Sequence, residues 1–155
     1  MIVFIDSGVL GLLSSPNEKL EVKQCQEWLY SLLSKGVYVI SSDLCDYEVR
    51  RSLLLNSIRG ASNQSIDNLN NLDNLINFLP MTKSVTQKAA ELWAISRFQG
   101  MPTANPKNID VDVIIAAQCQ LMQAENPGQN LVVANTNVKH LSRFINAQKW
   151  FEIRY

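Results

Sequence analysis

The first six residues, Met1-Ile-Val-Phe-Ile-Asp6, indicate the architecture of this protein. Residues 2–5 are all apolar and mostly β-branched, which is typical of a central strand buried on both faces of a sheet. Asp6 stands where that strand ends. Because ligands bind outside the carboxyl ends of the strands in open parallel α/β sheets, a carboxylate there is well placed for chemistry. Alternatively, Asp6 or Ser7 only caps the turn that follows.

Length and composition predict a single globular domain over residues 1–155, of which 46% are hydrophobic. The 14 basic and 14 acidic residues balance, so any surface for nucleic acid or membrane must be a local patch. The three cysteines are odd in number and lack metal-ligand spacing, which indicates buried free thiols in a reducing compartment. No basic segment precedes the apolar start, and no apolar run reaches the ~18–20 residues of a membrane span, so we expect a cytoplasmic protein.

Short β-branched runs alternate with helical patterns along the chain. Gly8 and Gly11 loosen the segment after the first strand, and residues 14–17 have turn chemistry. Helices are expected at residues 18–35, 43–59, 61–76, 85–98 and 111–124, and further strands at 37–40, 77–81, 131–134 and 150–153, with a short helix before the last strand. This alternation predicts an α/β fold with a central parallel sheet of about five short strands and helices on both faces.

Two further acids fall where they could join Asp6. Asp112 begins an apolar helix, and either Asp112 or Asp110 could cap it; we assign capping to Asp110 and chemistry to Asp112. Glu48 lies within the helix after the second strand, where it could equally pair with Arg51 on the helix surface.

Carboxylates gathered at one sheet edge repel one another and cannot all stay ionised without a cation. Oxygen ligands select Mg²⁺ or Mn²⁺, whereas zinc favours His and Cys, and this chain has one histidine, His140, and three scattered cysteines. A cation held by a few carboxylates keeps several waters and suits phosphate chemistry, in which a metal-bound water attacks a phosphodiester. The residues therefore predict a Mg²⁺ or Mn²⁺ site.

The chain resembles the PIN domain, the fold of many small metal-dependent ribonucleases, including the VapC-type toxins of toxin–antitoxin pairs. The resemblance covers nearly the whole chain. Four stretches carry it, in the order and spacing of the family: Asp6-Ser7, Glu48 with Arg51, Asp112-Val-Ile-Ile-Ala-Ala, and Val133-Ala-Asn-Thr-Asn-Val-Lys-His-Leu.

The catalytic positions of the family are three regular acids and a fourth residue that is Asp or Asn, and they fall here on Asp6, Glu48, Asp112 and Asn137. Asn135 falls where the family usually has Thr or Ser, a hydroxyl that supports the first acid. Neither Asn135 nor Asn137 adds negative charge, and this departure bears on a second metal ion more than on activity. Ser7 and Asp110 are expected as supporting residues.

The resemblance implies an endoribonuclease that needs Mg²⁺ or Mn²⁺ and hydrolyses RNA with a metal-activated water. It also implies the toxin of a type II toxin–antitoxin pair with a cognate antitoxin, and a homodimer whose face comes from the helices of residues 43–79. Several basic residues could contact RNA phosphates or simply be solvated: Arg50, Arg51, Lys107, Lys139 and Arg143. His140 is expected to support local packing or a backbone contact. Trp28, Trp93 and Trp150 are expected in the core.

Two other interpretations compete with the enzyme. The first is a catalytically weak PIN scaffold that binds RNA or another protein, which the asparagines at 135 and 137 keep open. The second is a phosphoacceptor receiver-like domain, which also clusters acids at strand ends. That fold needs a phosphorylatable Asp at the end of a middle strand, and neither Ser41-Ser42 nor Pro80-Met81 supplies one.

Overall fold

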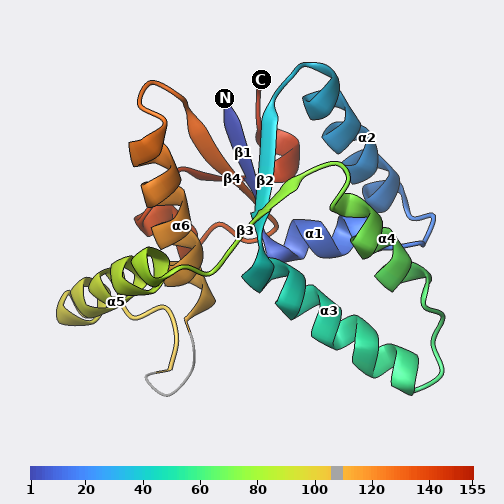
Figure 1. Cartoon of the computed structure of the whole chain (residues 1–155), viewed down its shortest axis with the longest axis horizontal. Helices are drawn as coiled ribbons and strands as arrows, with labels where there is room; N and C mark the ends of the chain where they lie inside the picture. Colours follow the sequence, from blue (N-terminus) through green and yellow to red (C-terminus); the bar gives the residue numbers. More distant parts are fainter. Residues whose placement is uncertain (106–109) are drawn as a thin grey trace.

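A computed structural model describes residues 1–105 and 110–155 (Figure 1). Its centre is one five-stranded sheet in the order β3-β2-β1-β4-β5, in which every neighbouring pair is parallel. The strands are β1 (Ile2–Ile5), β2 (Tyr38–Ser42), β3 (Asn77–Leu79), β4 (Leu131–Asn135) and β5 (Ala147–Lys149). The predicted α/β fold with a five-stranded parallel sheet is therefore confirmed.

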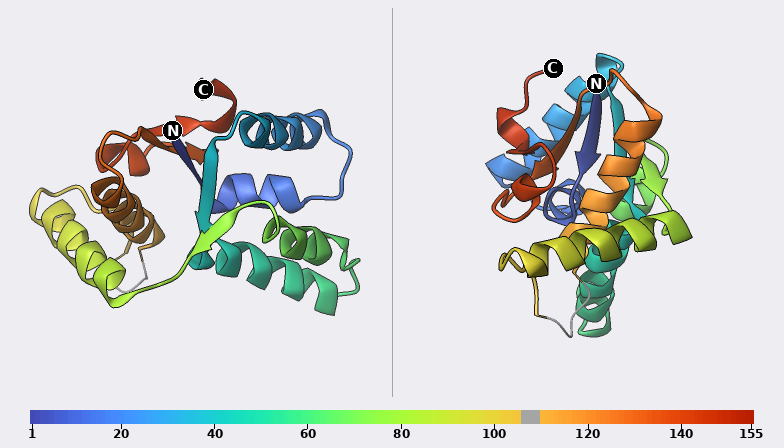
Figure 2. Two further views of the ribbon diagram at one scale, coloured as in Figure 1. Left: turned by 45° about the horizontal axis from the view of Figure 1, so that its top comes forward. Right: turned by 90° about the vertical axis from the view of Figure 1, so that its left-hand side faces the viewer.

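Helices cover both faces of this sheet. They are α1 (Ser7–Ser14), α2 (Leu20–Ser34), α3 (Asp43–Ile58), α4 (Gln64–Leu72), α5 (Lys83–Phe98) and α6 (Val111–Glu125), with short 3₁₀ turns η1 (Leu141–Arg143) and η2 (Trp150–Glu152). Figure 2 shows α1 to α4 on one side of the strands and α5 and α6 on the other. The two termini lie together at one end of the sheet, so the carboxyl end of β1 points to the opposite end.

β1 is the central strand, and all four of its residues are buried. It pairs with both β2 and β4, in a register that sets Ile5 beside Ala134. The backbone N–H of Asp6 then donates to the Ala134 carbonyl at 3.1 Å. This register brings the residues that follow β1 and β4 to the same edge of the sheet.

One prediction from the sequence was wrong. Two glycines indicated a loose segment after the first strand, but residues 7–14 form helix α1. Val9, Leu10 and Leu13 are buried in the core. Their burial outweighs the roughly 1 kcal/mol that each glycine costs in a helix relative to alanine. Tertiary packing therefore overrides local propensity here.

The last strand is the second correction. It was expected at residues 150–153, but β5 occupies Ala147–Lys149 and Trp150 begins a 3₁₀ turn. Trp150 is 5% exposed and packs on Trp28, with their ring centroids 5.7 Å apart. Both tryptophans lie in the core as predicted, whereas Trp93 is only half-buried and stacks against Arg97. The three cysteines are buried and free, as predicted.

Among the helices that the structure describes, none combines the length and apolar character needed to cross a membrane.

Candidate active site

A polar cavity of about 300 Å³ opens at the carboxyl ends of β1 and β4. We call it the acidic cavity. Its lining residues are Asp6, Ser7, Gly8, Glu48, Val111, Asp112, Asn135, Thr136, Asn137 and His140. The three acids singled out from the sequence, 6, 48 and 112, thus share one cavity although they come from separate segments of the chain. No Lys or Arg side chain lines it within the described part of the chain.

Asp6 is the most deeply placed of these acids, with 9% of its surface exposed. Its Oδ1 accepts hydrogen bonds from the backbone N–H of Ser7 and, at 3.1 Å, from the Ser7 hydroxyl, so Asp6 does cap helix α1. Burial nevertheless raises the pKa of Asp6 to about 6, and the nearby charges of Asp112 and Glu48 add to the rise. The Ser7 hydrogen bonds only partly offset it. Asp6 is therefore both a cap and a carboxylate whose charge no Lys or Arg of the described residues offsets from the cavity wall.

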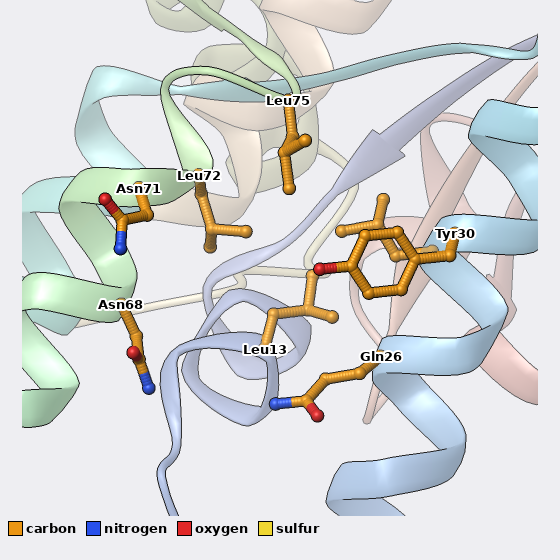
Figure 3. Close-up of a pocket in the computed structure, with 8 residues that line it drawn as sticks. Leu13, Gln26, Tyr30, Asn68, Asn71, Leu72 and Leu75 are labelled. Carbon is orange, nitrogen blue, oxygen red and sulfur yellow. The ribbon is translucent and has the colours of Figure 1, made fainter.

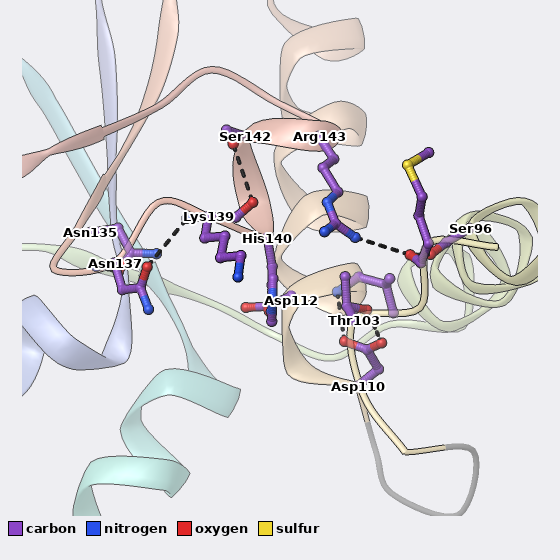
Figure 4. A network of polar contacts seen from close by, with 12 residues as sticks. Ser96, Thr103, Asp110, Asp112, Asn135, Asn137, Lys139, His140, Ser142 and Arg143 are labelled. Carbon is purple, nitrogen blue, oxygen red and sulfur yellow. Dashed lines mark hydrogen bonds and ion pairs between the residues drawn. The ribbon is translucent and has the colours of Figure 1, made fainter. Parts of the chain in front are cut away.

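Asp112 enters the cavity from the first turn of α6. Its Oδ2 lies 3.2 Å from Nδ1 of His140, a residue that follows β4 (Figure 4). Burial raises the pKa of Asp112, the contact with His140 lowers it, and Asp110 raises it further. The net pKa shift is upward. The ordinary capping role at this helix is filled by Asp110, whose Oδ1 accepts from the backbone N–H of Val113 at 3.4 Å.

Asp110 does not line the cavity. It is 6% exposed, and its other oxygen accepts a hydrogen bond from the Thr103 hydroxyl. Asp110, expected as a supporting residue, thus holds the start of α6 and contacts Thr103 of the preceding loop.

Glu48 reaches the cavity from α3 and keeps the surface partner predicted for it. Its Oε1 lies 3.9 Å from Nη2 of Arg51, and the Arg51 guanidinium sits over the Tyr47 ring at 5.5 Å. The Arg51 side chain is 59% exposed, so this ion pair is loose and solvent-screened. The ion pair with Arg51 therefore does not keep the Glu48 carboxylate from facing the cavity.

The two asparagines build the turn after β4. Oδ1 of Asn135 accepts from the backbone N–H of Asn137 at 2.8 Å, and Oδ1 of Asn137 accepts from the backbone N–H of Lys139 at 3.4 Å. Asn135 is 4% exposed. Its side chain thus holds the turn, where the family pattern has a hydroxyl beside the first acid.

Thr136, the residue after Asn135, brings a hydroxyl to the cavity. Gly8 faces it so closely that a Cβ at position 8 would lie 2.5 Å from Oγ1 of Thr136. This close approach favours glycine in the first turn of α1, because a larger residue would force the Thr136 side chain to move. The sequence signals missed here were the Thr that follows Asn135 and the glycine two residues after Asp6.

His140 is the residue whose placement differs most from its predicted role. It was expected to support packing or the backbone, yet its ring pairs with a cavity acid and its side chain is 40% exposed. Asp112 and His140 are 28 residues apart, so no local spacing indicates the contact. Its being the only histidine, three residues after Asn137, was the available signal.

The basic residues considered for RNA contacts differ in their position relative to the cavity. Lys139 is exposed on the turn that carries Asn137 and His140. Lys107 lies outside the described residues. Two of the other arginines are engaged away from the cavity: Arg50 binds Asp46 and Asn70, and Arg143 donates to the Met101 carbonyl.

The described residues include no cluster of three or more His, Cys, Asp or Glu side chains arranged to hold a metal ion. The three acids of the cavity face one hollow without forming a finished ligand set. All three nevertheless offer hard carboxylate oxygens, the donors that Mg²⁺ and Mn²⁺ prefer, and no Lys or Arg of residues 1–105 and 110–155 lines the cavity beside them.

A second hollow of about 230 Å³ lies between α1, α2 and α4 (Figure 3). We call it the neutral groove, because none of its lining residues is charged. They are Leu13, Gln26, Leu29, Tyr30, Asn68, Asn71, Leu72 and Leu75. Leucine, amide and phenol groups bind apolar and hydrogen-bonding partners, and among these lining residues only Tyr30 could exchange a proton, whereas the acidic cavity gathers three carboxylates. The acidic cavity is therefore the candidate active site.

Solved structures of other proteins superpose on this chain over nearly its whole length. No family model and no curated protein matches the sequence. The structure of VapBC-1 from nontypeable Haemophilus influenzae superposes with a TM-score of 0.67 at 19% identity, over 98% of this chain and 100% of that one. VapBC2 from Rickettsia felis, bound to a DNA fragment from their promoter, superposes with a TM-score of 0.69 at 17% identity, over 97% and 99% of the two chains.

A protein of Pyrobaculum aerophilum superposes more loosely, with a TM-score of 0.53 at 12% identity, over 97% and 93% of the two chains. At these identities the likeness concerns the fold. The chain has the PIN-like fold that its sequence predicts, and its structural neighbours include VapBC proteins.

Proposed function

We propose that this protein is a Mg²⁺- or Mn²⁺-dependent endoribonuclease and the toxin of a type II toxin–antitoxin pair. One observation carries the proposal: three acids from separate segments line one cavity, and burial and mutual repulsion raise the pKa of Asp6 to about 6. An enzyme that binds a divalent cation gains from such uncompensated negative charge. The likeness in fold to VapBC proteins supports the same class.

Asp6, Glu48 and Asp112 would hold the cation, and Asn137 lines the same cavity with an amide. When bound, a cation of this kind supplies an activated water and stabilises the leaving oxygen of a phosphodiester. Ser7 fixes the Asp6 carboxylate through two hydrogen bonds to one oxygen. Lys139 at the rim would attract the RNA backbone, and Arg51 would do so where it is not held by Glu48.

The partners follow from the same proposal. A cognate antitoxin would accompany the toxin, as the VapBC names of the structural neighbours indicate. A homodimer would use the exposed apolar side chains of α3, which include Tyr47, Leu54, Leu55 and Ile58. Light scattering of the purified protein measures that oligomeric state.

The test is RNA hydrolysis by the purified protein. We expect cleavage with Mg²⁺ or Mn²⁺, none with EDTA, and a loss of roughly 100-fold or more in Asp6→Asn and in Asp112→Asn, since each removes a ligand charge. Asp67→Asn is the matched control, because Asp67 is an exposed acid of α4 that does not line the cavity. Equal cleavage by both cavity variants and wild type would refute the site.

A weak PIN scaffold remains the second candidate. It is favoured by the asparagines at 135 and 137, whose side-chain oxygens are engaged with the backbone of the turn. RNA binding without cleavage, equal in the presence and absence of Mn²⁺, is the result that this scaffold predicts.

A further inference from the structure

The turn that carries His140 is firmly anchored on both sides. Before it, the Asn135 and Asn137 side chains accept backbone hydrogen bonds. After it, Leu141 is 1% exposed and belongs to the hydrophobic core. The imidazole is therefore held at the wall of the acidic cavity by the fold, and does not hang from a free loop.

The contact between His140 and Asp112 has a defined chemistry. Nδ1 lies 3.2 Å from Oδ2, and an ionised carboxylate can only accept a hydrogen bond. The ring must therefore carry a hydrogen on Nδ1 for this contact to form. Among the described residues, no donor to Oδ1 of Asp112 accompanies it. One oxygen is fixed, and the other is left for the cavity.

The other two acids are held differently. Asp6 is fixed by the next residue in the chain, Ser7, and Glu48 pairs loosely with Arg51 within its own helix. Of these three acids, and as far as the described residues go, Asp112 alone is held by a partner from a distant segment. A change at position 140 can therefore release one acid while leaving the supports of the other two in place.

We propose that His140 is a positioning residue for Asp112: by donating from Nδ1 to Oδ2, it turns Oδ1 toward the acidic cavity and strengthens the binding of a divalent cation there. This inference rests on the proposed function for the identity of the cation. Partners that hydrogen-bond a metal-ligating carboxylate fix its orientation before binding, and their loss costs roughly 10- to 100-fold in metal affinity or activity.

The test is calorimetric titration of the whole protein with Mn²⁺. In His140→Leu the donor is lost, and in His140→Gln the amide donor is displaced by one bond toward the position of Nε2. We expect both to bind Mn²⁺ about 10- to 100-fold more weakly. His140→Asn places its amide nitrogen near the position of Nδ1, and we expect it to restore affinity to within about threefold of wild type. Ser142→Ala, an exposed change in the same turn, should leave affinity unchanged.

The inference predicts an order of Mn²⁺ affinities: wild type and His140→Asn bind more tightly than His140→Leu and His140→Gln. Equal affinity in the wild type, Leu and Gln variants would overturn the inference, as would a wild type that binds no Mn²⁺. If His140→Leu does not fold, the contrast between Asn and Gln still decides, because both are amides at one position. RNA cleavage measured in parallel separates the two proposals. Binding of Mn²⁺ that depends on His140 but gives no cleavage supports this inference and refutes the proposed function.

Discussion

The two ends of helix α1 face opposite kinds of surface. Its N-terminal end, with Asp6, Ser7 and Gly8, opens into the acidic cavity, and Leu13 near its C-terminal end lines the neutral groove. The two hollows are of similar size, about 300 and 230 Å³. One is lined by three acids and the other by uncharged residues only. The eight-residue helix α1 thus connects a cavity in which carboxylates repel one another to a groove lined by uncharged side chains.

The two ends of α1 differ in how they affect the stability of the folded protein. Burying Asp6 without a cation is unfavourable, as its raised pKa records. Leu13 at the other end is 4% exposed and packs in the main core. We therefore expect changes at the two ends to have opposite consequences for folding and for cation binding.

The largest effect on folding is expected at the groove. Leu72→Ala removes a side chain that is 6% exposed, so it should lower the free energy of unfolding by about 2–5 kcal/mol. Urea denaturation measures this loss, and Mn²⁺ affinity of the folded variant should stay at the wild-type value. Leu75→Ala is the control, because Leu75 lines the same groove but is 39% exposed and should cost much less. A large fall in Mn²⁺ affinity in Leu72→Ala would contradict the separation of the two ends.

The second effect has the opposite sign. In the metal-free protein the pKa of Asp6 rises from 3.8 to about 6 on folding, so the folded state holds the proton more tightly. Stability should fall as pH increases from 3.8 to 6 and then level off, by about 3 kcal/mol at most. Asp6→Asn removes this fall and keeps an oxygen for the Ser7 hydrogen bonds. We expect it to be more stable than wild type above pH 6 and equal to it near pH 4.

Chemical denaturation of both proteins in EDTA, between pH 4 and 8, measures this difference. The matched variant is Asp67→Asn, whose stability should follow wild type across the range because Asp67 is exposed. An Asp6→Asn protein that is less stable than wild type at pH 7 would show that Asp6 is not under electrostatic strain.

A smaller effect is expected from Gly8 and Thr136. Gly8→Ala alone should destabilise the protein by about 1–2 kcal/mol, since its Cβ would meet Oγ1 of Thr136 at 2.5 Å. In a Thr136→Ala background that clash is gone, and the better helix propensity of alanine should make Gly8→Ala neutral or stabilising. A double-mutant cycle on the free energy of unfolding measures the coupling. Additive effects would mean that the two residues do not contact each other.

The smallest effect is expected at the C-terminal end of α1. The Asn68 side-chain amide donates to the Ser14 carbonyl at 3.1 Å, one of the last helical carbonyls, which have no partner within the helix. Asn68→Ala should lower stability by about 1 kcal/mol, measured by thermal unfolding. Asn71 lines the same groove but is exposed, so the comparison variant Asn71→Ala should change stability by less than about 0.5 kcal/mol.

The sheet could be predicted from sequence because its inner strands are buried along nearly their whole length. Residues 2–5, 37–40 and 131–134 are continuous apolar runs, and the structure has strands at all three. The outermost strand β5 could not be predicted in the same way, since Ala147-Gln-Lys149 is only half-buried and carries no apolar pattern. Trp150-Phe-Glu-Ile153 has the pattern of a strand but uses its tryptophan to pack on Trp28.

The acids of the cavity were accessible to sequence reasoning because each stands at a recognisable place on a strand or helix. The partner of Asp112 was not, since a histidine 28 residues away gives no periodic signal. The helix after Asp6 was hidden for a related reason. Its stability comes from contacts of Val9, Leu10 and Leu13 with the rest of the core, which local propensity does not report.

The pairing of β1 with β4 has a consequence for the order in which a ribosome delivers the chain. Residues 2–5 leave the ribosome before residues 131–135, one of their two strand partners, which follow roughly 6–25 seconds later at ordinary rates of elongation. Asp112 follows Asp6 by more than 100 residues, and Asn137 and His140 are made only after β4. In the nascent chain, Asp6 therefore has Ser7 and Glu48 as neighbours well before Asp112, Asn137 and His140 join them. The acidic cavity therefore gains its full lining only after residues 131–140 have been made.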